Sequence, residues 1–446
     1  MRVSLPDPKE FSECFTEITG EKLNSDVTGI TIDSRDVKPG DLYIALSGRR
    51  TDGHKFVPAV ELEGCSAALV SAFSEDCKSI QQIKVGHPLK TIGQIARLWR
   101  ENLGIPVLGI TGTNGKTSTK ELIKHILSAN MTVHATEGNY NTSIGVPLTV
   151  LTMSSTHEIS ILELGANQSG DIRYLCDVTK PNHGLITNIA PAHLEGFGSV
   201  EEIAKEKGEL FLSLTNGSAF VNYADENVCT LPCSATKISY GLTPNCDFPA
   251  DIISEDDGRL TLIIDSEEIP TDSRNFTFLK NVIAAASVSV TLGVEWDDFR
   301  ERISTFDPPK GRCQVKQFNS VTVIDDTYNA NLESTIAAID YLQAFGGNGR
   351  RIFIFGDMFE LGKDAELHHR KIGKKCKQNQ LDAVYLLGEK TLFTDMELNS
   401  SITHRHYVSK NELISSLKES FKDGDKILIK GSRGMAMETV IQGIFD

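Results

Sequence analysis

The stretch GITGTNGKTS, residues 109–118, combines residue types that bind phosphate. It follows an apolar run and opens a helical pattern over 116–129, and backbone amides at a helix N-terminus bind anions. A lysine there can reach the β- and γ-phosphates of a nucleotide, and a threonine hydroxyl can bind Mg²⁺. The common pattern GxxxxGK[ST] would require glycine at 110, where isoleucine stands, so an ordinary glycine turn with a solvated lysine is the alternative. We predict a nucleotide site formed by Gly112, Thr113, Asn114, Gly115, Lys116, Thr117 and Ser118.

Two further polar residues follow apolar strands in the same part of the chain. Glu163 ends the run ISILE, and His193 comes shortly after GLITNIA. Ligands of doubly wound sheets gather at the carboxyl ends of the strands, so we predict that both side chains bind Mg²⁺ beside the phosphates. Imidazole is an unusual partner for so hard a cation, and each residue could instead be a capping or hydrogen-bonded loop residue.

Polar groups also follow predicted strands in the last third of the chain. Asp325 and Asp326 follow VTVI, where they could bind a ribose hydroxyl or form a turn. Lys430 and Arg433, in KGSRG, suit a carboxylate or a phosphate, although Lys430 could also be a surface residue.

The local sequence does not decide the role of two other charged segments. Ser34 and Arg35 lie in TIDSRD, ahead of a second basic loop, RRTDGH, and these two loops could hold an anionic ligand or be surface turns. The segment EEIAKEKGELF, 201–211, predicts a solvated helix face with ion pairs four residues apart.

The order of expected strands and helices divides the chain into three α/β domains. Short alternating runs and turn residues indicate a small α/β domain with exposed loops over 1–103. Continuous apolar strands alternating with helices over 104–310 predict a central, P-loop ATPase-like domain with a mostly parallel sheet. The prolines and glycine of FDPPKGR interrupt this periodicity at 306–312, and the elements beyond predict a Rossmann-like, doubly wound domain over 311–446.

Composition excludes several classes of protein. The net charge of −15 argues against a general affinity for nucleic acid or for anionic membranes, which need a positive field. The N-terminal segment lacks the features of a signal peptide, and no apolar run approaches the length of a membrane span, so we expect a cytoplasmic protein without membrane insertion. The nine cysteines occur without a CxxC pair, which indicates reduced thiols rather than zinc ligands.

Several motifs occur together in an order that resembles the Mur ligase family, ATP-dependent enzymes that form amide bonds in peptidoglycan synthesis. These motifs are GTNGKTS, EGNYNTSIGVP, ITNIAPAHLEGFGS, AKEKGE, DDTYNAN, FGDMFELG and KGSRG. The match is best to the branch that joins D-alanyl-D-alanine to the terminal carboxylate of UDP-N-acetylmuramoyl-tripeptide through an acyl phosphate, releasing ADP and phosphate. The alternative is another Mur-type or folylpolyglutamate-type ligase with a different acceptor or amine. The resemblance also implies a cytoplasmic monomer that serves cell-wall biogenesis, cell shape and cell division.

The resemblance implies roles for individual residues. Lys116 and Thr117 would serve ATP, and Thr117, Glu163 and His193 would hold two Mg²⁺ ions together with a carbamylated lysine, which matches Lys207 best and Lys205 second. The remaining matches are Asn281 beside the adenine, Arg312 at the phosphates, Asp326 at the ribose, Ser34 and Arg35 at the UDP-sugar, and Asn139, Asn141, Asn329, Lys430 and Arg433 on the substrate side. The C-terminal domain is expected to swing closed on ATP.

The chain departs from the family pattern at a few positions. Lys280 stands where histidine is usual and Ala284 where a second asparagine is usual, so the adenine contacts are expected to differ. Leu332 replaces the proline common after YNAN, and Gln168 replaces a histidine. None of these changes removes a group from the predicted phosphate or metal site.

Overall fold

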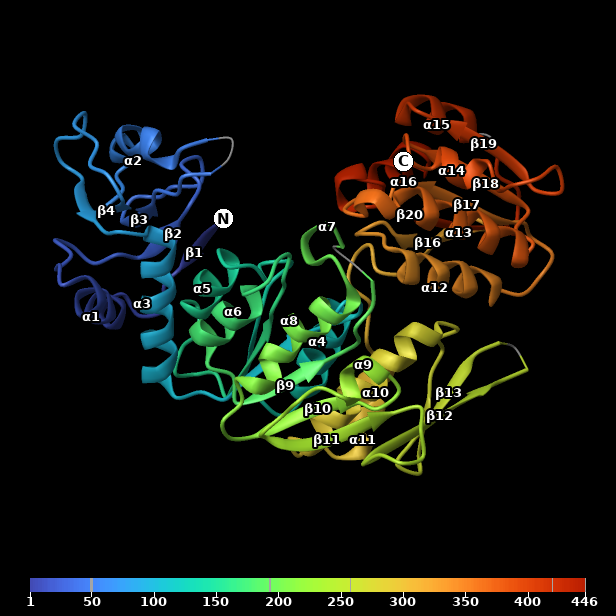
Figure 1. Cartoon of the computed structure of the whole chain (residues 1–446), viewed down its shortest axis with the longest axis horizontal. Helices are drawn as coiled ribbons and strands as arrows, with labels where there is room; N and C mark the ends of the chain where they lie inside the picture. Colours follow the sequence, from blue (N-terminus) through green and yellow to red (C-terminus); the bar gives the residue numbers. More distant parts are fainter. Residues whose placement is uncertain (49–50, 192–193, 257, 419, 446) are drawn as a thin grey trace.

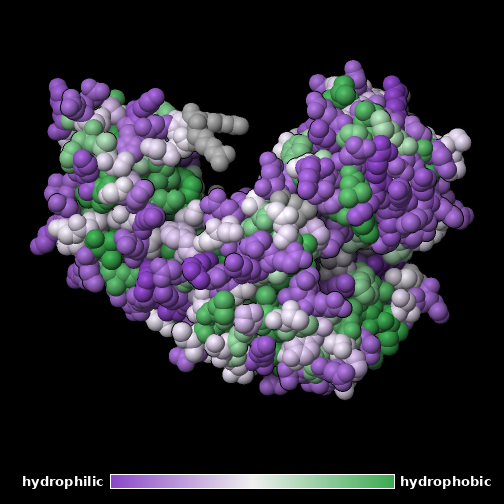
Figure 2. Space-filling model, in the orientation of Figure 1, coloured by the Kyte–Doolittle hydropathy of each residue, from purple (hydrophilic) through white to green (hydrophobic). Residues whose placement is uncertain are grey.

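The computed structural model describes residues 1–48, 51–191, 194–256, 258–418 and 420–445. Three β-sheets, each covered by helices, follow one another along the chain (Figure 1). The first and last domains lie at the two ends of the molecule, and the central domain joins them below. Figure 2 shows that the surface is hollowed between the two outer domains. The prediction of three α/β domains is confirmed, whereas the exact residue boundaries stay predictions.

The first sheet has five strands in the order β1-β2-β3-β4-β5. Strand β1 is antiparallel to β2, and the other neighbours are parallel. The strands are β1 (Arg2–Ser4), β2 (Gly29–Thr31), β3 (Asp41–Ile44), β4 (Ala67–Val70) and β5 (Gln81–Lys84). The helices are α1 (Pro8–Thr19), the 3₁₀ helix η1 (Gly53–Phe56), α2 (Val57–Leu62) and α3 (Pro88–Leu103).

The central sheet has nine strands in the order β14-β13-β12-β11-β10-β9-β6-β8-β7. It is parallel from β7 to β12 and ends in an antiparallel extension of two strands, which the sequence did not reveal. Its strands are β6 (Val107–Thr111), β7 (Val133–Ala135), β8 (Ile159–Glu163), β9 (His183–Ile186), β10 (Ser218–Asn222), β11 (Thr236–Gly241), β12 (Phe248–Ser254), β13 (Leu260–Ile264) and β14 (Glu267–Pro270).

The helices of the central domain cover both faces of this sheet. Strands β6 and β8 are buried along their whole lengths, as expected for strands of a parallel sheet between two helical layers. The helices are α4 (Lys116–Leu127), α5 (Gly145–Val150), α6 (Asp171–Thr179), α7 (Leu194–Phe197), α8 (Val200–Leu212), α9 (Glu226–Cys229), α10 (Phe276–Thr291) and α11 (Trp296–Ser304). Because β6, β8 and β9 are parallel neighbours, the loops after them meet at one edge of the sheet.

The C-terminal sheet has the order β15-β16-β20-β17-β18-β19, with only β15 antiparallel to its neighbour. Its strands are β15 (Gln314–Phe318), β16 (Val321–Asp326), β17 (Arg351–Gly356), β18 (Ala383–Leu387), β19 (Thr403–Tyr407) and β20 (Lys426–Lys430). Its helices are α12 (Leu332–Gln343), η2 (Gly362–Asp364), α13 (Ala365–Gln378), α14 (Leu392–Asp395), α15 (Lys410–Leu417), η3 (Arg433–Met435) and α16 (Glu438–Phe445). The last strand of the chain therefore lies beside the first parallel strand of this domain.

Helix α3 joins the first domain to the central domain (Figure 1). Its residue Trp99 is fully buried, in an apolar cluster that also contains Phe11 of α1, Leu148 of α5 and Leu175 of α6. The Trp99 indole Nε1 donates to the Met153 carbonyl at 3.1 Å, which satisfies its one polar group. The two domains thus share one apolar core through this helix. No helix in the described part of the chain is long and apolar enough to cross a lipid bilayer.

Removing the Trp99 side chain should destabilise this shared core. We expect Trp99→Ala to lower the free energy of unfolding by about 3–5 kcal/mol, because it leaves a cavity and an unpaired carbonyl. Urea unfolding followed by circular dichroism measures the change. Leu62→Ala is the control, since Leu62 is 87% exposed and its truncation should leave the transition in place. Equal midpoints for the two variants would contradict the role given to Trp99.

Candidate active site

A cavity of about 1460 Å³ lies between the central domain and the C-terminal domain. The residues of the phosphate-binding loop line it from one side, together with the ends of β8 and β9 and the start of α10. The segments that follow β16 and the last residue of β20 line it from the C-terminal domain. The cavity therefore includes most of the residues that the sequence singled out in these two domains.

The two glycines of the loop are required by close packing. Gly112 has a φ of 146°, and a Cβ atom there would lie 1.9 Å from the Thr187 hydroxyl oxygen. Gly115 has a φ of 82°, and a Cβ atom there would lie 2.6 Å from the Asn281 side-chain oxygen. Ile110, by contrast, lies inside β6 and is fully buried. The sequence lacks the glycine that GxxxxGK[ST] requires at 110 because β6 continues to Thr111, and the turn of the loop begins only at Gly112.

The loop is held by Asn188, which follows β9. The Asn114 amide donates to the Asn188 side-chain oxygen at 3.0 Å, and the Asn188 side-chain amide returns a bond to the Asn114 carbonyl at 2.9 Å. The Thr113 amide donates to the Asn188 carbonyl at 2.9 Å. These bonds hold the loop in its conformation. Sequence reasoning gave Asn188 no role, because only the pairing of β6 with β9 brings Asn188 beside the loop.

Lys116 lies over its own loop. Its Nζ donates to the carbonyls of Gly112 at 2.6 Å and Thr113 at 3.1 Å. Burial lowers the pKa of Lys116, the Glu163 carboxylate raises it, and the Arg312 guanidinium lowers it. A phosphate bound in the loop would be a stronger partner for this ammonium than two neutral carbonyls.

The Glu163 carboxylate connects three of the predicted residues. Its two oxygens accept from the Thr117 hydroxyl at 2.8 Å and from the Asn141 side-chain amide at 2.7 Å, and the residue is 2% exposed. The Arg312 guanidinium reaches across from the start of the C-terminal domain and donates to the Thr117 hydroxyl at 2.8 Å. The structure therefore brings Thr117, Asn141, Glu163 and Arg312 together beside Lys116.

The donor chemistry of this group fits Mg²⁺, which prefers oxygen ligands and is usually held by one or two carboxylates together with substrate phosphates. Thr117 and Glu163 supply a hydroxyl and a carboxylate. Within the described residues, no group of three or more histidine, cysteine, aspartate or glutamate side chains is arranged to hold a metal. His193, a predicted metal ligand, lies outside the residues that the structure describes.

Helix α8 presents a buried lysine to this site. Lys207 is 5% exposed and lines a small pocket together with Gly112, Lys116 and Phe197, whereas Lys205 is exposed. Burial first, and then the Lys116 charge, lowers the pKa of Lys207 to about 7, against a raising effect of Glu206.

The expectation of a solvated face on this helix is wrong for Glu206 and Lys207. Glu206 is 4% exposed, and its carboxylate accepts from the backbone amides of Gly170 at 2.7 Å and Ile172 at 2.6 Å. These amides belong to the first turn of α6, so Glu206 caps that helix. The charge pattern of one segment does not reveal this partner, because α6 and α8 are packed together only in the fold.

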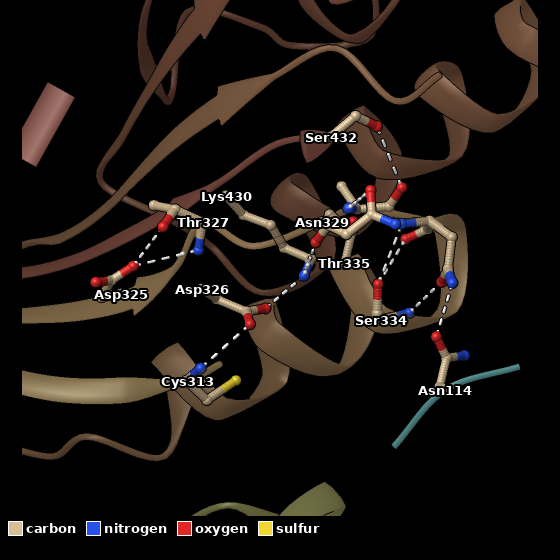
Figure 3. A network of polar contacts seen from close by, with 12 residues as sticks. Asn114, Cys313, Asp325, Asp326, Thr327, Asn329, Ser334, Thr335, Lys430 and Ser432 are labelled. Carbon is tan, nitrogen blue, oxygen red and sulfur yellow. Dashed lines mark hydrogen bonds and ion pairs between the residues drawn. The ribbon is translucent and has the colours of Figure 1, made fainter. Parts of the chain in front are cut away.

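A second polar group lies at the edge of the C-terminal sheet (Figure 3). Asp326 and Lys430 are paired residues of β16 and β20, and Lys430 Nζ bonds the Asp326 carboxylate at 2.5 Å and the Asn329 carbonyl at 2.9 Å. The Cys313 amide donates to the other Asp326 oxygen at 3.2 Å. Lys430 is 2% exposed, which rules out the surface role considered for it. All four residues line the cavity.

Arg312 and Arg433 both approach Tyr328. The Arg312 guanidinium lies 4.0 Å from the centre of the Tyr328 ring, and that of Arg433 lies 5.9 Å from it. Arg433 is ion-paired with Glu438 at 2.8 Å, and its side chain is 59% exposed. Arg433 does not line the cavity, whereas Arg312 lines it and reaches the phosphate loop.

Asn331 bridges the C-terminal domain and the phosphate loop. Its side-chain oxygen accepts from the Ser334 amide at 2.9 Å and caps α12, while its side-chain amide donates to the Asn114 side-chain oxygen at 2.7 Å. Sequence reasoning missed this residue. Its capping role could have been found from an asparagine three residues before a serine at the start of a helix, but the contact with Asn114 depends on the domain arrangement.

The other predicted nucleotide and substrate residues divide between two places. Asn139 and Asn281 line the large cavity, and so do Lys280 and Ala284, the two positions that depart from the family pattern. Ser118 also lines the cavity, next to the loop glycines.

Ser34 and Arg35 do not line the large cavity and lie in the first domain. The Arg35 side chain is 86% exposed and pairs with Asp33 at 2.6 Å. Burial first, and then the charges of Asp33 and Asp52, raise the pKa of Tyr43 to about 12. The Tyr43 hydroxyl donates to the Gly53 carbonyl, in the segment after β3, at 3.0 Å. A ligand site shared by the loops after β2 and β3 stays a prediction.

Three family descriptions match this chain in order along its length. They are the Mur ligase family catalytic domain over residues 26–100, the Mur ligase middle domain over 110–289 and the Mur ligase glutamate ligase domain over 311–433. A UDP-N-acetylmuramoyl-tripeptide–D-alanyl-D-alanine ligase of Synechocystis is 32% identical over 99% of this chain and 97% of its own length. The chain belongs to the Mur ligase family.

Solved structures of this family share the fold over nearly the whole chain. MurF from Acinetobacter baumannii superposes with a TM-score of 0.89 at 27% identity, covering 99% of this chain and 100% of its own. MurF ligase from Thermotoga maritima in complex with ADP superposes with a TM-score of 0.82 at 28% identity, covering 93% of this chain and 96% of its own. The three-domain arrangement of this Mur ligase is thus that of the solved MurF structures.

The bridge between Asn331 and Asn114 can be separated from the helix cap by substitution. Serine caps helices as well as asparagine does but is too short to reach Asn114. We expect Asn331→Ser to keep the melting temperature and to open the contact between the two domains, since one hydrogen bond of about 0.5–1.5 kcal/mol is lost. Small-angle X-ray scattering would record a larger radius of gyration.

The matched variant is Asn331→Ala, which loses the cap as well. It should open the domains to the same extent and also cost about 1 kcal/mol of stability, measured by thermal unfolding. A radius of gyration unchanged in both variants would show that this bridge does not hold the domains together.

Proposed function

We propose that this Mur ligase joins D-alanyl-D-alanine to the terminal carboxylate of UDP-N-acetylmuramoyl-tripeptide and consumes ATP. The observation that carries the proposal is the meeting of Lys116, Thr117 and Glu163 of the central domain with Arg312 of the C-terminal domain in one cavity. This is the set of groups that phosphoryl transfer to a carboxylate requires. The names of the relatives that match over full length supply the two substrates.

The ligands are distributed over the three domains in this proposal. ATP occupies the central cavity, with its phosphates at the loop from Gly112 to Ser118, its adenine near Asn281 and its ribose near Asp326. The UDP-sugar is bound by the first domain at Ser34 and Arg35. The tripeptide and the dipeptide are held on the substrate side by Asn139, Asn141, Asn329, Lys430 and Arg433.

The chemistry follows from the weakness of a carboxylate as an electrophile. One oxygen of the tripeptide carboxylate attacks the γ-phosphorus, ADP leaves, and an acyl phosphate forms. Lys116 and Arg312 would balance the charge on the transferred phosphoryl group, and their positions beside the loop and Thr117 support this role. The amine of D-alanyl-D-alanine then attacks the acyl carbon, and the tetrahedral intermediate expels phosphate and loses a proton to give the amide.

Two Mg²⁺ ions, when bound, would neutralise the phosphate oxygens. Thr117, Glu163 and His193 are the residues of this chain proposed to hold them. Lys207 would add a further anionic ligand after carbamylation, which converts its amine to a carbamate. The small pocket beside Lys116 and the pKa of about 7 support this choice, because an uncharged amine is the form that reacts with carbon dioxide.

The cellular role follows from the proposed reaction. Its product is a precursor of peptidoglycan, so the enzyme would act in the cytoplasm in cell-wall biogenesis and support cell shape and cell division. We expect it to act as a monomer, because the cavity is formed by the domains of one chain.

The reaction can be tested with purified protein, UDP-N-acetylmuramoyl-tripeptide, D-alanyl-D-alanine and MgATP. We expect a product whose mass exceeds that of the tripeptide substrate by one dipeptide less one water, with one ADP released per product. Mass spectrometry measures the product and a coupled assay measures ADP. Replacing the dipeptide by glutamate or a diamino acid tests the alternative of another Mur-type or folylpolyglutamate-type ligase. Ligation of one of these amines in place of the dipeptide would overturn the substrate assignment.

Lys207 and Lys205 form a matched pair for testing the carbamate. We expect Lys207→Ala to lose at least about 100-fold in kcat, since an anionic metal ligand is removed, and to regain activity with added short-chain carboxylates. Lys205→Ala should keep wild-type kcat, because that side chain is exposed. Wild-type activity in the Lys207 variant, or equal losses in both variants, would exclude the role of Lys207.

A further inference from the structure

Lys120 is a fully buried lysine for which the proposed mechanism has no use. It lies in α4, one turn after Lys116, and its side chain is 0% exposed. Its ammonium donates to the Thr136 carbonyl and is paired with the Glu121 carboxylate at 2.7 Å. Burying an ammonium costs free energy that burying an apolar side chain of the same size would not cost. The presence of lysine rather than an apolar residue at position 120 therefore needs an explanation.

Thr136 uses its amide and its hydroxyl to fix the strand that carries Glu163. It follows β7, is 1% exposed, and its amide donates to the Ile161 carbonyl at 3.0 Å. Its hydroxyl accepts from the Glu163 amide at 3.0 Å. The Thr136 carbonyl, the remaining group, accepts from Lys120. The backbone of Glu163 is therefore anchored to a residue that Lys120 holds from the other side.

The loop that begins at Thr136 also orients the Glu163 side chain. Asn141 in this loop donates from its side-chain amide to the Glu163 carboxylate at 2.7 Å. The Asn141 carbonyl accepts from the Gly165 amide at 2.8 Å, which fixes the loop against the residues just after Glu163. Both the main chain and the carboxylate of Glu163 thus depend on the segment that starts at Thr136.

We propose that Lys120 is a positioning residue whose buried ammonium, acting through Thr136, holds the Glu163 carboxylate in the orientation that binds the metal–nucleotide complex. The proposal rests on the proposed function, in which Glu163 faces Mg²⁺. Methionine at 120 would keep the volume but leave the Thr136 carbonyl without a donor, and the loop would loosen. Arginine would keep a donor and the pair with Glu121.

The test compares the Mg²⁺ dependence of nucleotide binding in three variants of the full-length protein. Isothermal titration with the non-hydrolysable analogue AMP-PNP is performed over a series of Mg²⁺ concentrations. We expect Lys120→Met to raise the Mg²⁺ concentration needed for half-maximal affinity by at least about fivefold and to lower kcat by about 10–100-fold.

The control variant must lower the stability of the protein without changing the contacts that link Lys120, Thr136 and Glu163. Ile123→Val, in the same helix and at a fully buried position, leaves a small cavity and should lower the melting temperature while the Mg²⁺ dependence stays that of the wild type. Lys120→Arg should recover most of the Mg²⁺ affinity. A purely structural lysine would give parallel losses of melting temperature in Lys120→Met and Ile123→Val with no change in Mg²⁺ dependence, and this result would overturn the proposal.

Two further outcomes are decisive. If Lys120→Met does not fold, Thr136→Val replaces it, because it removes the hydroxyl that accepts from Glu163 and must show the same Mg²⁺ shift. A wild-type Mg²⁺ dependence in Thr136→Val would refute the proposal. If the wild-type protein binds the analogue in a Mg²⁺-dependent way but forms no ligation product, the proposed function fails while the positioning role of Lys120 is still decided by the titration.

Discussion

The carboxylate of Glu163 is the interaction on which the site depends. It is nearly fully buried at the end of β8, among the Thr117 hydroxyl, the Asn141 amide and the nearby charges of Lys116 and Arg312. A buried carboxylate is stable only where donors and positive charges surround it, and these donors come from distant segments of the chain. The order of strands in the central sheet is what brings them together, because β6, β8 and β9 end at the same edge. A bound phosphate would complete this balance of charge.

The C-terminal domain contributes directly to that edge. Arg312 reaches the hydroxyl of Thr117 from 195 residues away, and Asn331 reaches Asn114 from 217 residues away. All four of these residues line the cavity in which the nucleotide is proposed to bind. The position of this domain therefore decides whether the phosphate loop has its full set of partners. A domain that closes on the nucleotide would also keep water from an acyl phosphate, which a ligase must do to avoid simple hydrolysis.

Sequence reasoning locates residues well where the local pattern decides. The loop from Gly112 to Ser118 lies between β6 and the start of α4, and Glu163 ends β8, as the sequence predicts, whereas the roles of these residues stay predictions. Residues whose role depends on packing between distant elements were missed, among them Asn188 and Asn331. Lys207 could be chosen over Lys205 only through the family resemblance, because the side of α8 that is buried depends on its contact with α6. Nothing in the local pattern marks Lys120 either, since its partner Thr136 lies just after β7, in another segment of the chain.

The transfer of oxygen from the substrate carboxylate to phosphate tests the central claim most directly. The tripeptide substrate is labelled with ¹⁸O in its terminal carboxylate and incubated with MgATP, D-alanyl-D-alanine and the enzyme. If the carboxylate is activated as an acyl phosphate, each phosphate released carries one ¹⁸O atom, detected by mass spectrometry. Unlabelled phosphate released in step with ligation would contradict this account, because the carboxylate would then have been activated without receiving the phosphoryl group.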